Sequence, residues 1–180
     1  SWKEFISYHT SYDFISDFYN IFGNSIKKYY PNSNSKLPNE TNIGIRTKDN
    51  SYFQTDCQFV INTPSKIKTS VITPHLDSPN KFYAALLYMR DYKDDSFGGN
   101  FTINAYSKKR SFHNNTRLLK ECNLIQEVEY TANRLVMFLN TPLSIHGVTE
   151  RSPTNFHRRY INFVGQFNFE LFNYKQFENN

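Results

Sequence analysis

The stretch "VITPHLDSPNKFYAALLYM", Val71 to Met89, decides how the middle of this chain is interpreted. It places His75 and Asp77 one residue apart, and a polar turn then leads into the longest apolar run, Phe82 to Met89. In a strand, residues i and i+2 project from the same face, so this imidazole and this carboxylate can be presented to one point. Taken alone, the spacing also fits an ordinary strand end, with Asp77 opening the "DSPN" turn.

Short β-rich runs separated by turn residues surround this stretch from about Ile43 onward. Aromatic residues make up 17% of the sequence, which favours a packed sheet over a helical bundle. Repeated short strands at this spacing predict a β-sandwich or a jelly-roll. The runs are "SYFQTDCQFVINTP", "KTSVITPHLD", "FYAALLYMRD", "GGNFTINAYS", "LIQEVEYTANRLVMFLN", "LSIHGVT" and "RRYINFVGQFNFELF".

The first thirty residues, "SWKEFISYHTSYDFISDFYNIFGNSIKKYY", have apolar residues at helical spacing, with Gly23 expected to interrupt or end the helix. We therefore expect a mainly β protein of the α+β class with N-terminal helices. A chain of 180 residues is most economically a single domain. Residues 1–42 would form a helical N-terminal support, and residues 43–180 a jelly-roll core.

The net charge and the cysteine content indicate which binding partners and which cellular compartment to expect. The net charge of +5 permits an anionic partner, but the basic residues are scattered, which favours a solvated surface over a nucleic-acid site. Cys57 and Cys122 lie far apart without a metal-binding spacing, so we interpret them as reduced thiols of a cytoplasmic protein. The longest apolar run is too short to span a bilayer, so no membrane partner is expected.

A third metal ligand is supplied by "NRLVMFLNTPLSIHGVT", where His146 follows a long apolar strand and a short turn. Two histidines and one carboxylate on one face of an octahedron leave three positions open, an arrangement that suits non-haem iron(II). Zinc would usually be held tetrahedrally, with fewer open positions. The remaining histidines are interpreted as surface or packing residues: His9, His113 and His157.

A candidate anion-binding arginine lies in "NFHRRYINFVGQF". Read as a strand, this segment has two faces, which carry Arg159, Ile161 and Phe163 on one side and Arg158, Tyr160 and Asn162 on the other. The Arg159 face is the more apolar, so we expect it to point inward. A buried arginine needs an anion, and a carboxylate matches its two-pronged donor group. The alternative is that both arginines are flanking charges on an edge strand.

These motifs, in this order, resemble the 2-oxoglutarate- and iron(II)-dependent oxygenases, and within them the prolyl 4-hydroxylase and prolyl hydroxylase domain branch. "HLDSPN" resembles the iron-binding turn of that branch, and "LLYMRDYKDDSFGGNF" resembles its following strand and Gly-Gly turn. "NRLVMFLNTPLSIHGV" is similar to the strand before the distal histidine, and "RRY" to the co-substrate-binding Arg-Tyr pair. The similarity runs from about Ile72 to Phe167.

The resemblance implies a double-stranded β-helix core with His75, Asp77 and His146 as iron ligands. It implies that Arg159 pairs with the distal carboxylate of 2-oxoglutarate. Arg158 is the alternative, because "ERSPTNF" lengthens the interval after His146. Tyr88 matches a strand tyrosine that bonds the same carboxylate, and it could equally be a core residue. The cofactors implied are Fe(II), 2-oxoglutarate and O2, with ascorbate as a further candidate.

The activity implied is hydroxylation of a C–H bond with release of succinate and CO2, and no catalytic residue beyond the metal centre is implied. The leading substrate is a prolyl residue of a peptide or protein. A free amino acid or another small molecule is the alternative. Nucleic-acid demethylation is less favoured, because "RRYINFVGQF" lacks the second arginine of the alkylation-repair enzymes. A non-catalytic, cupin-like binding module is the alternative from another class. The sequence does not predict the oligomeric state.

Overall fold

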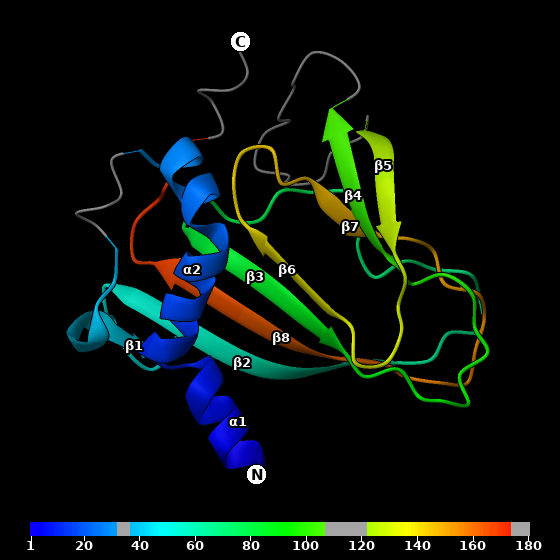
Figure 1. Ribbon diagram of the computed structural model, residues 1–180. Helices are drawn as coiled ribbons and strands as arrows, with labels where there is room; N and C mark the ends of the chain where they lie inside the picture. The colour runs from blue at the N-terminus through cyan, green and yellow to red at the C-terminus, as the bar shows by residue number, and fades with distance from the viewer. Residues whose placement is uncertain (32–36, 107–121, 174–180) are drawn as a thin grey trace.

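The computed structural model describes residues 1–31, 37–106 and 122–173, and shows helices packed against one of two β-sheets (Figure 1). The expected mainly β fold with N-terminal helices is confirmed. The helices are α1 (Trp2–His9), α2 (Tyr12–Tyr29) and the short 3-10 helix η1 (Glu40–Asn42). The strands are β1 (Ile43–Ile45), β2 (Phe53–Asn62), β3 (Lys81–Tyr88), β4 (Phe101–Tyr106), β5 (Cys122–Val128), β6 (Leu135–Leu139), β7 (His146–Val148) and β8 (Arg158–Phe167).

The larger sheet has the order β1-β2-β8-β3-β6 and the smaller sheet has the order β5-β4-β7. In the larger sheet β8 is central and pairs antiparallel with both β2 and β3. Within the described residues the two sheets do not close into a barrel. The architecture is therefore compatible with a β-sandwich or jelly-roll, while the double-stranded β-helix and the single-domain organisation stay predictions.

Both helices cover the outer face of the larger sheet, where most of the core lies (Figure 1). The buried side of α2 is apolar, and Phe18 packs against Phe82 and Tyr83 of β3. The prediction that Gly23 interrupts the helical run is wrong. The break lies earlier, where Ser11 adopts an extended conformation as the N-cap of α2. No helix in the described part of the chain is both long and apolar enough to cross a membrane.

A second apolar cluster fills the space between the two sheets. Tyr88 of β3, Phe101 of β4 and Tyr130 form its buried centre. The Phe101 ring lies 5.7 Å from the ring of Phe138 on β6, so side chains of both sheets meet there. The larger sheet is therefore covered on both faces, by helices on one side and by the smaller sheet on the other.

The predicted strand at residues 68–77 is wrong, because this segment forms only isolated bridges. Thr69 pairs with Arg151, and His75 pairs with His146. The Val148 N–H donates to the carbonyl of Ile72, so the register slips beyond the pair of His75 and His146 and no continuous ladder forms. The segment still follows β7 closely, since the His75 N–H donates to the His146 carbonyl at 2.8 Å and the His146 N–H returns the bond at 3.1 Å. This reciprocal pair brings two distant parts of the sequence together.

Candidate metal centre

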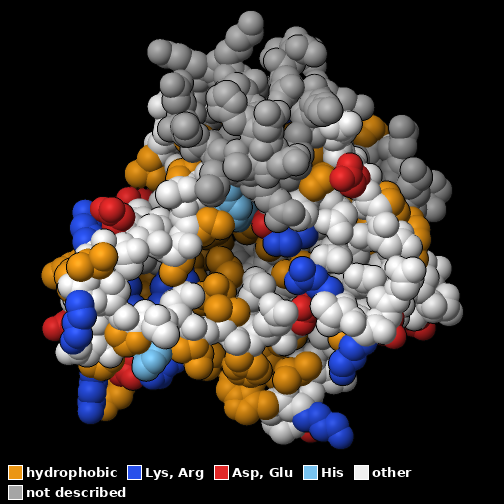
Figure 2. Space-filling model, turned by 180° about the vertical axis from the view of Figure 1, so that it is seen from behind, with side chains coloured by type: hydrophobic (Ala, Val, Ile, Leu, Met, Phe, Trp, Pro, Cys, Tyr) orange, Lys and Arg blue, Asp and Glu red, His pale blue; other side chains and the backbone are white. Residues whose placement is uncertain are grey.

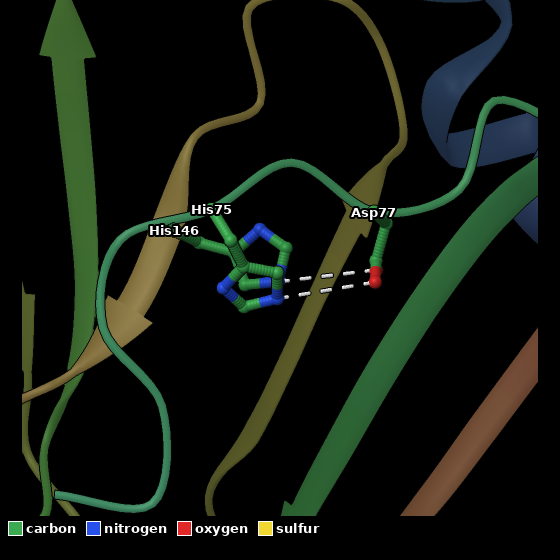
Figure 3. Close-up of side chains that lie close together, drawn as sticks. All are labelled: His75, Asp77 and His146. Atoms are coloured by element: carbon green, nitrogen blue, oxygen red, sulfur yellow. Dashed lines mark ion pairs between the residues drawn. The ribbon is translucent and has the colours of Figure 1, made fainter. Parts of the chain in front are cut away.

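Three potential metal ligands converge between the sheets: His75, Asp77 and His146 (Figure 3). The Nε2 atom of His75 lies 4.0 Å from Oδ1 of Asp77, and the Nε2 atom of His146 lies 3.8 Å from Oδ2. One ligand atom from each residue lies within 4.8 Å of the other two. The structure thus brings together all three residues singled out in the sequence, while their role as metal ligands stays a prediction.

Main-chain carbonyls orient both imidazole rings. Nδ1 of His75 contacts the carbonyl of Thr73 at 3.0 Å, and Nδ1 of His146 contacts the carbonyl of Ser144 at 2.9 Å. Because a carbonyl oxygen can only accept, each Nδ1 carries the proton. Each Nε2 is then left with a lone pair on the side of Asp77, which is how metal-binding histidines are commonly positioned.

The local electrostatics favour the forms that bind metals. Burial lowers the pKa of His146 to about 4, despite the opposing Asp77 carboxylate, and burial also lowers the pKa of His75. Burial acts to raise the pKa of Asp77, but the Lys81 ammonium and the two imidazoles together bring it below its ordinary value. At neutral pH the site therefore holds neutral imidazoles and an ionised carboxylate, the states that ligation requires.

Lys81 is a member of this group that the sequence reasoning missed. Its Nζ donates to Oδ1 of Asp77 at 2.7 Å. A register irregularity between Lys81 and Tyr83 breaks the alternation of β3, and Phe82 and Tyr83 both belong to the core beneath the helices. The irregularity therefore allows Lys81 to turn toward the opposite side of the sheet, where the metal ligands lie. No periodic pattern in the sequence marks such a bulge.

Arg158 is buried at the start of β8, with 3% of its surface exposed. Its Nε donates to the carbonyl of Gly99 at 3.2 Å, while its buried Nη2 has no hydrogen-bond partner among the described residues. The guanidinium carbon lies about 5 Å from three tyrosine rings, at 5.0 Å from Tyr88, 4.8 Å from Tyr130 and 4.9 Å from Tyr160. The Tyr88 hydroxyl adjoins this guanidinium, is also buried, and has no other hydrogen-bond partner among the described residues. Two buried polar groups thus lie side by side without a further partner in the described part of the chain.

The inward orientation predicted for Arg159 is wrong. Its side chain is 45% exposed and pairs with Asp91, with 3.6 Å between Nη1 and Oδ2. The face that it shares with Ile161 and Phe163 is indeed apolar, but the helices cover that face. Arg158 points into the space between the sheets instead. Periodicity separated the two faces correctly, but the more apolar face was not the one that adjoins the site.

The other arginines near Arg158 already have an acidic partner. Asp94 is fully buried and pairs with Nη2 of Arg151 at 2.6 Å and with Nε of Arg90 at 3.4 Å. No acidic side chain of the described residues pairs with Arg158. The sequence reasoning missed Asp94 and Arg151, which lie outside the strands, where no periodicity signals burial. The region around Tyr130 therefore carries buried positive charge in excess of negative charge.

An open cleft reaches Arg158 from the surface. Its space, including the open mouth, is about 350 Å³. Its lining includes Gly99, Arg151 and Arg158 together with several Ser and Thr residues. Figure 2 shows that the back of the molecule is hollowed, with hydrophobic, basic, acidic and histidine side chains around the hollow. A small polar ligand can thus approach the guanidinium.

The remaining histidines take no part in the described group. The His9 ring stacks on Phe163 at 4.6 Å beneath the helices, and His157 is exposed. His113 lies outside the described residues. Among the described residues, the His75, Asp77 and His146 group is the one cluster with the geometry of a metal site.

No protein-family model matches this sequence, and no curated protein sequence matches it. Among solved structures, the chain is similar to the crystal structure of a Pseudomonas putida prolyl-4-hydroxylase, with 19% identity and a TM-score of 0.34. The match covers 63% of this chain and 51% of that chain, so it spans about half the length of the hydroxylase. The function proposed below rests on the geometry of the site and on the sequence motifs.

Proposed function

We propose that this protein is an iron(II)- and 2-oxoglutarate-dependent dioxygenase that hydroxylates a C–H bond and releases succinate and CO2. The observation that carries this proposal is a buried His-Asp-His group that borders the same inter-sheet aromatic cluster as Arg158, whose guanidinium has no acidic partner among the described residues. The first group offers a metal three ligands, and the second offers an anion a buried cation. A metal and a small dicarboxylate together satisfy both.

The residues of the triad fit iron(II). Both Nε2 atoms have a lone pair directed at the Asp77 side, and Lys81 already occupies Oδ1 of the carboxylate. Oδ2, which faces His146, would then be the oxygen that binds the metal, and three protein ligands would leave coordination positions for other groups. Iron(II) bound there would supply the oxygen activation and oxidative chemistry that the side chains of this site cannot.

Arg158 and Tyr88 fit the distal carboxylate of 2-oxoglutarate, with Arg158 now taking the role first assigned to Arg159. Among the described residues, Nη2 of Arg158 and the Tyr88 hydroxyl are buried next to one another and have no further hydrogen-bond partner. Gly99, which anchors Arg158, lies four residues before Ile103, the residue paired with His146. Ile103 belongs to β4, and Gly99 lies just before that strand. A short dicarboxylate would be bound to the metal at one end and hydrogen-bonded to Arg158 at the other.

Aromatic side chains separate the metal ligands from bulk solvent. The His146 ring lies 4.5 Å from the ring of Phe138 and stacks on Phe101 at 5.4 Å. These contacts fix the imidazole and limit the entry of water, which suits a site that must direct an oxidant to one substrate.

The proposed substrate is a prolyl residue of a peptide or protein, on the basis of the motif resemblance. A free amino acid or another small molecule is the second choice, and neither a nucleic acid nor a membrane is proposed as a partner. The location proposed is the cytoplasm, and ascorbate is proposed as a reductant that keeps the iron ferrous.

The decisive experiment is an anaerobic titration with iron(II) and 2-oxoglutarate. We expect a weak visible charge-transfer band from keto-acid chelation to an open iron site, and we expect His146→Ala to abolish it. Succinate release against proline-containing peptides and free amino acids then identifies the substrate class. A folded native protein without the band would refute the oxygenase proposal.

The ion pair between Lys81 and Asp77 favours one other candidate, a cupin-like module that binds a carboxylate without catalysis. The ammonium neutralises Asp77, so the pocket does not need a metal for charge balance. Calorimetry of 2-oxoglutarate binding separates the two candidates. The oxygenase should bind 2-oxoglutarate much more tightly with iron(II) than with a chelator, whereas the binding module should show equal affinity under both conditions.

A further inference from the structure

Lys81 brings a positive charge to the edge of the metal centre. Its side chain is 19% exposed, and its Nζ lies 2.7 Å from Asp77. An ammonium has three donors, and the contact with Asp77 uses one of them. Lys81 can therefore hold Asp77 and still donate to a second acceptor at the partly open edge of the site.

Few charged side chains of the described residues lie near the triad. Among the described residues, the charged side chains that act on the imidazoles of His75 and His146 are Asp77 and Lys81. A bound dication carries two positive charges, which Asp77 and the chelating carboxylate of the co-substrate balance with one negative charge each. Arg158 balances the other carboxylate. The charge of Lys81 is then left over, and a partly buried charge without a counter-charge is unfavourable.

We propose that Lys81 selects a substrate that carries a carboxylate beside the carbon to be oxidised. The inference rests on the proposed oxygenase function and narrows its substrate class. The carboxylate accepts a hydrogen bond from Lys81 and balances the remaining positive charge, which orients the neighbouring carbon toward the metal. The carboxylate can belong to the substrate's own terminus or to an acidic side chain next to the reacting residue.

Two matched substrate pairs test this proposal and distinguish the two sources of the carboxylate. The first pair is N-acetyl-L-proline and N-acetyl-L-prolinamide, and the second is one peptide with Asp or with Asn beside an internal proline. Succinate release should give a kcat/KM about ten- to a hundredfold higher for the charged member of one pair, the range expected of a hydrogen bond between charged groups. The pair that shows the preference identifies the source.

Three variants assign the preference to Lys81. Lys81→Met and Lys81→Gln remove the charge and should bring the two members of the pair to nearly equal kcat/KM, whereas Lys81→Arg should keep part of the preference. Lys68→Met is the matched control, because Lys68 is an exposed lysine that pairs with Glu150 on the surface. This control should behave like the native protein.

A binding measurement gives a readout that is independent of turnover. Calorimetry with the anaerobic protein, loaded with iron(II) and 2-oxoglutarate, should show tighter binding of the charged member in the native protein and no difference in Lys81→Met. Equal affinities in the native protein, or no binding of any of the four compounds, overturn the Lys81 proposal. If the charge-transfer band is present in those cases, the oxygenase function stands. Absence of the band refutes both proposals.

Discussion

The two faces of β8 differ in what they contribute to the molecule. One face places Ile161 and Phe163 in the largely apolar core beneath the helices. The other places Arg158 and Tyr160 toward the smaller sheet, in the same space as the metal ligands. A single strand thus separates a face that stabilises the fold from a face that carries buried charge. Burial alone therefore does not identify a site, because both faces of β8 are largely buried.

The largest effect should come from the helix-covered face. Phe163 is 1% exposed and contacts the rings of Phe5, His9 and Phe14. Phe163→Ala should lower the free energy of unfolding by about 3–5 kcal/mol, as measured by urea denaturation, because it leaves a cavity in an aromatic core. The folded fraction should keep its affinity for iron(II) and 2-oxoglutarate. A large loss of either affinity would show that the two faces are not independent.

The stability of the protein should depend on pH through the histidines that lie between the two sheets. The unfolded chain protonates His146 near its ordinary pKa, whereas burial keeps the pKa of the folded form at about 4. Between these values the unfolded state binds more protons, so stability falls as the pH is lowered from about 6.5 to 4. The loss should reach about 3 kcal/mol, and the lowered pKa of His75 acts in the same direction.

Urea denaturation of the chelator-treated protein across this pH range measures the effect. His146→Gln should reduce the dependence of the free energy of unfolding on pH. His157→Gln, at an exposed position, should leave this pH dependence unchanged. A native protein with equal stability at pH 7 and pH 4.5 would contradict the expectation.

Arg158→Leu should weaken 2-oxoglutarate binding about a hundredfold, because it removes a buried charged donor from the proposed carboxylate site. The melting temperature without ligand should stay the same or rise, since a buried guanidinium that has no carboxylate partner among the described residues is replaced by an apolar group. Calorimetry and thermal melts measure these two quantities. A strong loss of stability with unchanged affinity would make Arg158 a purely structural residue.

The smallest effect should come from Arg159→Ala. Arg159 is largely solvated, and its ion pair with Asp91 should contribute less than about 1 kcal/mol to stability. We expect the affinity for 2-oxoglutarate to change less than about threefold. If Arg159→Ala weakens binding more than Arg158→Leu does, the two arginines have been assigned to the wrong faces.

Local patterns in the sequence predicted much of the fold. Apolar spacing located the N-terminal helices and most of the strands, and the two histidines and the aspartate were recognised from strand ends next to turns. Their convergence depends on the pairing of His75 with His146, which no local pattern encodes. The motif order supplied that long-range information through the resemblance.

The errors have physical causes. Alternation along β8 assigned Arg158 and Arg159 to opposite faces, but it could not tell which of two covered faces adjoins the metal ligands. Lys81 escaped notice because an irregularity in β3 reverses the side on which it lies. Asp94 lies in a polar loop, where burial arises from contacts with Arg90 and Arg151, outside any regular element.

The reciprocal main-chain bonds between His75 and His146 fasten an irregular segment to a strand of the smaller sheet. The spacing of the two imidazoles is consequently set by the backbone before any ion arrives, so little conformational freedom is lost on metal uptake. An ion bound there would act as a cross-link between the two sheets, and the sheets could not separate without releasing it. Heat should therefore free the metal and unfold the protein in the same step.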